Sequence, residues 1–228
     1  MITKRQLARY IDHTLVRATA TVEEVERHCE EARQLGFASV FVNPCYVPLA
    51  SRLLRGAGIR VGTVIGFPLG ATTDQVKAFE ARRAIQDGAD EVDMVMNIGA
   101  LRSGDYGLVK RDIEGVVRVA RSKGARVKVI IETCFLTDDE KRVASRIAKE
   151  AGADYIKTST GFGPGGATVR DIGIIREEVG DSMGVKASGG IRRAEQALAM
   201  IRAGATRIGT SHGVAILESL PSEEERQT

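Results

Sequence analysis

The chain lacks a long apolar run and an excess of charge of one sign. Its longest stretch without a charged residue, 34–51, is interrupted by Gly36, Asn43, Pro44 and Pro48, and its first ten residues contain no apolar segment. We therefore expect no membrane span, no secretory signal and a cytoplasmic location. Because 33 basic and 30 acidic residues leave a net charge of only +3 with no block of like charges, we also expect no nucleic-acid-binding surface.

Cysteine is scarce and follows no metal-binding pattern. Cys29, Cys45 and Cys134 are odd in number and widely spaced, and none belongs to a CxxC or Cys/His pair with metal-ligand spacing. This usage predicts reduced thiols and gives no support for a structural zinc site. We expect no bound metal ion.

A unit made of a helix-like stretch, a glycine and a β-branched run recurs along the chain. Its glycines, at 36, 88, 124, 152 and 204, stand where a left-handed residue ends a helix just before a strand. Three helices open with the [ST]xx[EQ] capping-box pattern, at Thr21–Glu24, Thr72–Gln75 and Thr137–Glu140. The strands that we predict span 10–14, 39–43, 60–66, 91–97, 127–133, 154–160, 184–188 and 206–210.

Strands that alternate with helices in this way predict parallel βαβ units. In a chain of 228 residues, eight such units favour a closed barrel over an open doubly wound sheet. The predicted fold class is therefore α/β, a single-domain (β/α)8 TIM barrel. Because no linker or composition shift divides the chain, we assign the catalytic domain to residues 1–220 and expect a frayed tail at 221–228.

Three charged residues stand inside short apolar strands, where an unpaired charge is costly to bury. They are Asp93 in EVDMV, Lys157 in DYIKTST and Lys186 in GVKASGG. A lysine becomes a nucleophile when burial or a neighbouring cation lowers its pKa, and Lys186 is suited to act on Lys157 from the adjacent strand. Asp93 would then balance the charge and take part in proton transfer. The pattern thus indicates Schiff-base chemistry, although a purely structural ion network has the same residues.

Glycine-rich turns after the last two strands indicate a phosphate site. Gly189 and Gly190 precede a helix that begins near Arg193, and Gly209 and Ser211 lie at the end of the final strand. In (β/α)8 enzymes these loops bind phosphate with backbone N–H groups and a helix N-terminus. Arg192 could add a charged contact or remain solvated, and glycine pairs also serve simply to give a loop backbone freedom.

Two familiar motifs are present but out of context. The GxGxxG pattern at 161–166 follows a strand, yet Pro164 delays the next helix to about Thr168, which argues against dinucleotide binding. The GxSxG pattern at 209–213 includes His212, but no further histidine follows it, as a serine hydrolase would require. We set both interpretations aside.

Taken together, the motifs resemble the deoxyribose-phosphate aldolase family over nearly the whole chain. The matching segments are Asp12-His13-Thr14, VIGFPLG (64–70), EVDMVMNIG (91–99), KVIIET (128–133), DYIKTSTGF (154–162), VKASGGIR (185–192) and RIGTS (207–211). The resemblance implies a class I aldolase that needs no metal ion or organic cofactor. Its reaction interconverts 2-deoxy-D-ribose 5-phosphate with D-glyceraldehyde 3-phosphate and acetaldehyde, in deoxyribonucleotide catabolism.

The resemblance also implies roles for individual residues. Lys157 matches the Schiff-base lysine, Lys186 the second lysine that lowers its pKa, and Asp93 the proton-transfer carboxylate. Thr158 and Thr160 are expected to contact substrate or orient the lysine, unless they are ordinary strand residues. Glu132 is expected to be an inward-facing orienting residue or part of a salt bridge. The remaining expected substrate contacts are Asp12 near the hydroxyls, and Gly161, Gly189, Gly190, Gly209 and Ser211 around the phosphate.

The chain departs from its relatives at three points. Phe41 stands where many relatives carry a cysteine, and Phe162 stands where some carry a lysine. Some relatives also end in a tyrosine that reaches the active site, whereas no tyrosine follows Tyr155 here. Relatives are often dimeric, so a homodimer is possible, although no interface is recognisable in the sequence. Three alternatives stay open: a Schiff-base aldolase for other phosphorylated sugars, a non-catalytic barrel that binds a phosphorylated ligand, and a structural role.

Overall fold

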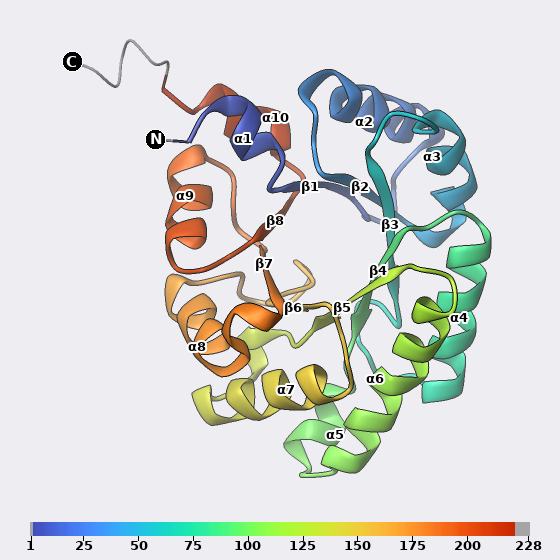
Figure 1. The fold of residues 1–228 in the computed structure, drawn as a ribbon, viewed down its shortest axis with the longest axis vertical. Helices are drawn as coiled ribbons and strands as arrows, with labels where there is room; N and C mark the ends of the chain where they lie inside the picture. Colours follow the sequence, from blue (N-terminus) through green and yellow to red (C-terminus); the bar gives the residue numbers. More distant parts are fainter. Residues whose placement is uncertain (1, 222–228) are drawn as a thin grey trace.

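The computed structural model describes residues 2–221, and in it eight parallel strands close into a barrel surrounded by helices (Figure 1). Each strand pairs with its sequence neighbours, and β8 closes the ring on β1. The predicted (β/α)8 fold is thereby confirmed. The strands are β1 (Ile11–Leu15), β2 (Ser39–Val42), β3 (Arg60–Ile65), β4 (Glu91–Val95), β5 (Arg126–Ile130), β6 (Tyr155–Lys157), β7 (Gly184–Ser188) and β8 (Arg207–Thr210). Apart from Pro221, the tail expected at 221–228 lies outside the described residues.

Helices form the outer layer, and α1 lies beside α10 where the chain begins and ends its circuit (Figure 1). None of the helices in the described part of the chain is long and apolar enough to cross a membrane. The helices are α1 (Lys4–Ala8), α2 (Val22–Leu35), α3 (Val47–Leu53), α4 (Asp74–Gln86), α5 (Ile98–Arg102), α6 (Tyr106–Arg121), α7 (Asp138–Glu150), α8 (Val169–Val179), α9 (Ala194–Arg202) and α10 (Gly213–Glu218).

Side-chain capping fixes where several helices begin. Two of the three predicted capping boxes are present, at Thr21–Glu24 on α2 and Thr137–Glu140 on α7. The prediction for α4 was wrong by one residue, because Thr73 rather than Thr72 is the cap and accepts a hydrogen bond from the N–H of Val76. Adjacent threonines are equally suited to this role, so the sequence pattern could not distinguish them.

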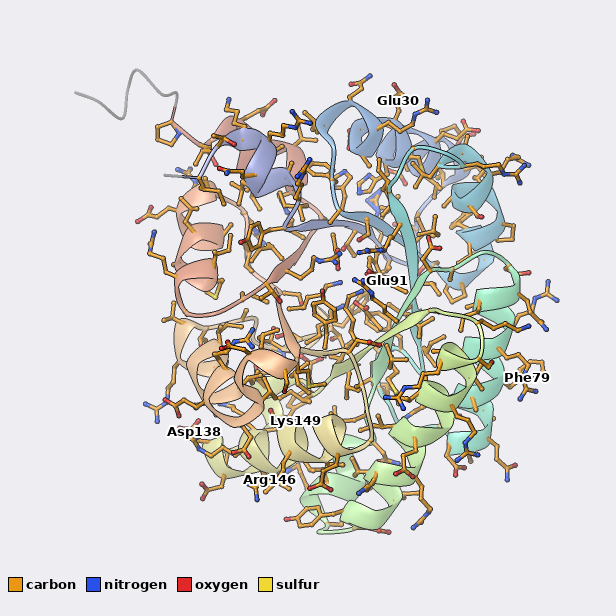
Figure 2. All side chains as sticks on the ribbon, in the orientation of Figure 1. Glu30, Phe79, Glu91, Asp138, Arg146 and Lys149 are labelled. Atoms are coloured by element: carbon orange, nitrogen blue, oxygen red, sulfur yellow. The ribbon has the colours of Figure 1, made fainter. Side chains whose placement is uncertain are left out.

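The two faces of the barrel strands carry different chemistry. Outward-facing residues such as Val92, Ile156 and Ile208 are fully buried in the apolar layer beneath the helices. Inward-facing residues include a set of charged side chains: Figure 2 shows Glu91 inside the ring, whereas Phe79 and Arg146 project outward from the helices. Because side chains alternate along a strand, a charged residue flanked by apolar ones points into the barrel while its neighbours stabilise the outer layer.

Candidate active site

The structure brings the three predicted catalytic residues into direct contact. The Nζ atoms of Lys157 and Lys186 donate hydrogen bonds to the same oxygen of Asp93, Oδ2, at 2.9 and 2.8 Å. The two lysines are also direct register partners on β6 and β7. Asp93 and Lys186 are fully buried, while Lys157 keeps 4% of its surface exposed and lines a cavity at the C-terminal ends of the strands.

Further charged residues lie beneath these three, and their positions in the sequence did not mark them as functional. Lys128 on β5 bonds to Glu91 and lies 3.1 Å from Oδ1 of Asp93. Arg207 on β8 reaches Oδ1 of Asp12 at 2.6 Å and Glu91 at 3.6 Å. Glu91 stands two residues before Asp93 in the sequence. Lys128 lies opposite Asp93 and Arg207 lies opposite Lys186, but pairing across strands becomes visible only when the register is known. We call the seven residues the interior charge network: Asp12, Glu91, Asp93, Lys128, Lys157, Lys186 and Arg207.

The network shifts the pKa values of its members in opposite directions. Burial alone would raise the pKa of Asp93 and Asp12, but the surrounding lysines hold both well below their usual range. Although burial opposes it, the carboxylates raise the pKa of Lys128 above its usual range. For Lys157, burial and the neighbouring Lys186 and Lys128 outweigh Asp93 and lower the pKa to about 8.

Charge balance gives the physical reason why Lys157 differs from the other cations. The network contains three carboxylates and four cationic side chains, all nearly or completely buried. With Lys157 neutral, the three carboxylates are matched by Lys128, Lys186 and Arg207, and no excess charge is left in a region of low dielectric. Lys157 is also the network lysine that opens into the cavity, so its free amine is accessible to a ligand.

The cavity above Lys157 has a volume of about 350 Å³ and is formed by the loops that follow β1, β6, β7 and β8. Its lining includes Arg17 and Arg192 but no carboxylate, which favours an anionic ligand. The sequence-predicted residues that line it are Lys157, Thr160, Gly161, Gly189, Gly190, Gly209 and Ser211.

Two expected substrate contacts lie outside the cavity lining. Asp12 is completely buried, with its carboxylate held by Lys186, Arg207 and the hydroxyl of Ser39. Thr158 exchanges hydrogen bonds with the backbone of Ser188 and so links β6 to β7. The geometry therefore gives Thr158, just after β6, a role in holding the ends of β6 and β7 together, and it places Asp12 behind Lys186.

Glu132 organises the loop after β6. It has a left-handed backbone with φ of 51°, which costs a non-glycine residue roughly 1–2 kcal/mol. Its carboxylate accepts hydrogen bonds from the N–H and the hydroxyl of Thr160. Within residues 2–221 these partners, rather than a cation, hold Glu132, so the salt bridge considered from the sequence is absent and the orienting role remains. These bonds also explain why β6 ends at Lys157 instead of continuing to 160 as predicted: Thr160 turns toward Glu132.

The glycine-rich side of the cavity is built mainly from tightly packed backbone. Gly189 and Gly190 both have positive φ values, and a side chain at Gly166 would lie 2.3 Å from the carbonyl oxygen of Gly189. This close approach explains a glycine of the GxGxxG segment without a dinucleotide. The N-terminus of α9, in contrast, is already satisfied: Gln196 accepts from the N–H groups of Arg192 and Arg193, and Ser219 accepts from Ala194. These bonds give no support to phosphate binding at this helix end, which stays a prediction.

A histidine–glutamate cluster lies on the outer face of β1, behind the active site. His13, His28 and Glu31 have potential ligand atoms within 4.8 Å of one another. However, the two rings stack in parallel with centroids 3.7 Å apart, so their planes do not converge on a common ion. Burial lowers the pKa of both histidines to about 4. The expected absence of a bound metal ion stays a prediction.

Comparison with known proteins gives a consistent result. A family model described as DeoC/LacD family aldolase matches residues 7–219. The chain is 61% identical to a deoxyribose-phosphate aldolase of Thermococcus gammatolerans over 220 residues, covering 96% of this chain and 98% of the relative. It is 58% identical to deoxyribose-phosphate aldolase 1 of Bacillus licheniformis over 221 residues, covering 97% of this chain and 99% of the relative.

Solved structures agree with the sequence relatives. The tetrameric deoxyribose phosphate aldolase of Aeropyrum pernix superimposes with a TM-score of 0.89 at 38% sequence identity, covering 95% of this chain and 92% of that one. A deoxyribose-phosphate aldolase structure from Coccidioides immitis gives a TM-score of 0.91 at 41% identity, covering 95% and 86%. Lys157 lies within a charge-balanced network at the floor of a cavity that favours anions. With this site, the family model and the relatives show that the chain belongs to the DeoC/LacD family of aldolases.

Proposed function

We infer that the protein is a class I aldolase that reversibly cleaves 2-deoxy-D-ribose 5-phosphate into D-glyceraldehyde 3-phosphate and acetaldehyde. The observation that carries this proposal is the amine of Lys157, which faces the cavity, contacts Asp93 and has its pKa lowered to about 8. At pH 7 about one-tenth of such lysines are unprotonated, against roughly one in 2,500 for an ordinary lysine. The names of the relatives supply the substrate.

The reaction follows from the chemistry of this amine. Lys157 adds to the C1 aldehyde of the open-chain sugar, and loss of water leaves an iminium ion. The iminium accepts the electron pair of the C2–C3 bond as the C3 hydroxyl loses its proton, which releases D-glyceraldehyde 3-phosphate. The resulting enamine is protonated at C2, and hydrolysis of the iminium frees acetaldehyde and the lysine.

The buried neighbours manage charge and protons during these steps. Oδ2 of Asp93 touches both Lys157 and Lys186, so it offers a path for a proton between the two nitrogen atoms. When the iminium forms, the same carboxylate stabilises the new positive charge at Lys157. Because neither Asp93 nor Lys186 lines the cavity, we assign them to proton and charge control rather than to recognition of the sugar.

The other end of the cavity is proposed to bind the phosphate. Gly189, Gly190, Gly209 and Ser211 place backbone and hydroxyl groups around it, and Arg192 adds positive charge. A non-catalytic barrel would use the same anion site but would have no need for a lysine with a lowered pKa. Its distinguishing property is ligand binding without a covalent adduct.

Trapping of the covalent intermediate tests the central proposal. Incubation with acetaldehyde and borohydride is expected to give a reduced adduct that peptide mapping places on Lys157, because only this network lysine is open to the cavity. Lys157→Ala should remove both the adduct and turnover while the far-ultraviolet circular dichroism is unchanged. Lys123→Ala, at an exposed position, is the control and should behave as the wild type. Wild-type turnover in Lys157→Ala would refute the mechanism.

The role of Lys186 is tested by the pH dependence of kcat/KM. Since Lys186 helps to lower the pKa of Lys157, Lys186→Leu should favour protonated Lys157 and move the acid limb from about 8 to higher pH. Each unit of that shift reduces the free amine at pH 7 about tenfold. Lys186→Arg keeps the charge and should shift the limb less. An unchanged profile in the leucine variant is the result that contradicts this role.

Adjacent arginines provide a matched test of phosphate binding. Arg192 lines the cavity, whereas Arg193 is the N-cap of α9 and does not. Arg192→Gln should raise KM for 2-deoxyribose 5-phosphate about tenfold, the lower end for losing a charged contact, with little effect on unphosphorylated 2-deoxyribose. Arg193→Gln should leave both constants near wild type. Equal effects on the two substrates would mean that Arg192 does not contact the phosphate.

We also propose that the protein is cytoplasmic and that it self-associates. The Aeropyrum pernix enzyme is tetrameric, and this chain exposes large apolar side chains on one segment: Leu69, Val76 and Phe79 are 75%, 45% and 65% exposed. Figure 2 shows Phe79 projecting away from α4. We propose a homodimer as the smallest assembly.

Light scattering coupled to size-exclusion chromatography tests this assembly. The mass should be twice that of the chain at micromolar concentration. Phe79→Glu is expected to shift the equilibrium toward monomer, because it places a charge in a buried apolar contact. Tyr106→Glu, which alters an exposed aromatic residue of α6, is the control and should remain dimeric. A monomeric wild type over the whole concentration range would refute the proposal.

A further inference from the structure

Phe41 is a fully buried aromatic residue that points into the charged barrel. It lies on β2 opposite Thr14 of β1 and Gly62 of β3. The absent side chain of Gly62 makes room for it, since a Cβ atom there would lie only 2.3 Å from Cζ of the Phe41 ring. Phe41 and Gly62 therefore form a size-matched pair, and the ring occupies space that would otherwise be open to water.

The ring lies against two ammonium groups of the interior charge network. The Nζ atom of Lys186 is 3.8 Å from the ring centroid, and that of Lys128 is 4.4 Å from it. Both distances are within the range of about 6 Å in which the negative face of an aromatic ring attracts a cation, and burial strengthens that attraction. Asp12 and Asp93 contact Lys186 at 2.6 and 2.8 Å, so the aromatic face is a third attractive contact of the same ammonium group.

We propose that Phe41 is a positioning residue for the aldol reaction: its ring face fixes the ammonium groups of Lys186 and Lys128 next to Asp93 and so keeps positive charge beside Lys157. An aliphatic residue of similar volume would fill the space and exclude water but would offer the cations no attraction. The proposal rests on the assignment of Lys157 as the Schiff-base lysine.

The effect on Lys157 follows from the groups that face it. These are Asp93 from β4, Lys128 from β5 and Lys186 from β7. After burial, Asp93 favours the protonated form of Lys157, while Lys186 and Lys128 oppose it and help to lower its pKa. If the ring no longer attracts the two cations, they are free to move away from Lys157, and the pKa of Lys157 rises. Phe41 thus affects reactivity without contacting the substrate cavity.

Fluorinated phenylalanines separate the charge of the ring face from its shape. Phe41 is replaced in turn by 4-fluoro-, 3,4,5-trifluoro- and pentafluorophenylalanine, which are nearly isosteric but have a progressively less negative face. The acid limb of the kcat/KM profile should move to higher pH in the same order. For the pentafluoro variant, kcat/KM at pH 7 should fall about tenfold, with recovery at higher pH, as expected for loss of a buried cation–π contact.

Phe37 is the matched control, because it is buried outside the barrel against His13 with centroids 4.8 Å apart. Pentafluorophenylalanine at Phe37 should leave the pH profile unchanged. An unchanged profile for the pentafluoro variant of Phe41, in protein with wild-type circular dichroism, would overturn the proposal, even if Phe41→Leu loses activity through altered packing. Borohydride trapping on Lys157 in the unsubstituted protein is measured in parallel, so that failure of the catalytic assignment is recognised separately.

Discussion

The carboxylate of Asp93 is the contact on which the active site depends. Its two oxygens meet the ammonium groups of Lys128, Lys157 and Lys186, which come from three consecutive strands of the barrel. Each of these cations is costly to bury alone, and Asp93 alone cannot neutralise all three. Asp12 and Glu91 supply the remaining negative charge, and Arg207 links them. The lowered pKa of Lys157 is thus a consequence of the charge balance of the whole interior.

The balance of charge differs along the barrel axis, because carboxylates and cations are paired in the interior, whereas the cavity carries cations without a carboxylate. The carboxylates lie in the sealed interior, whereas the cavity above is lined by Arg17, Lys157 and Arg192 without an acidic residue. An anionic ligand is therefore attracted to the open end, while Asp93 and Lys186 remain shielded from water. Glu132, held by Thr160, shapes the loop that joins the two regions. Phe41 fills the space beside Lys186 and presents its aromatic face to the ammonium group.

Burial of apolar side chains on the outer face of the strands offsets the free energy lost by desolvating the charged interior. Every inward-facing charge alternates with outward-facing residues such as Val92, Val129 and Val185, which are fully buried beneath the helices. At about 25 cal/mol per Å² of buried apolar surface, this continuous layer supplies the main favourable term that offsets desolvation of the network. The same alternation puts catalytic and stabilising residues on one strand, so stability and reactivity are arranged on its opposite faces.

The amino-acid sequence was sufficient to predict eight strands, the barrel and the proximity of Asp93, Lys157 and Lys186, because these depend on local periodicity and on charges within apolar runs. It could not identify Glu91, Lys128 and Arg207 as partners, since their role arises from register between strands far apart in the chain. Tertiary structure likewise placed Asp12 behind Lys186, paired the N–H of Ala194 at the start of α9 with Ser219 and ended β6 at Lys157. Each of these depends on which polar groups meet across the fold, and such contacts leave no periodic trace in the sequence.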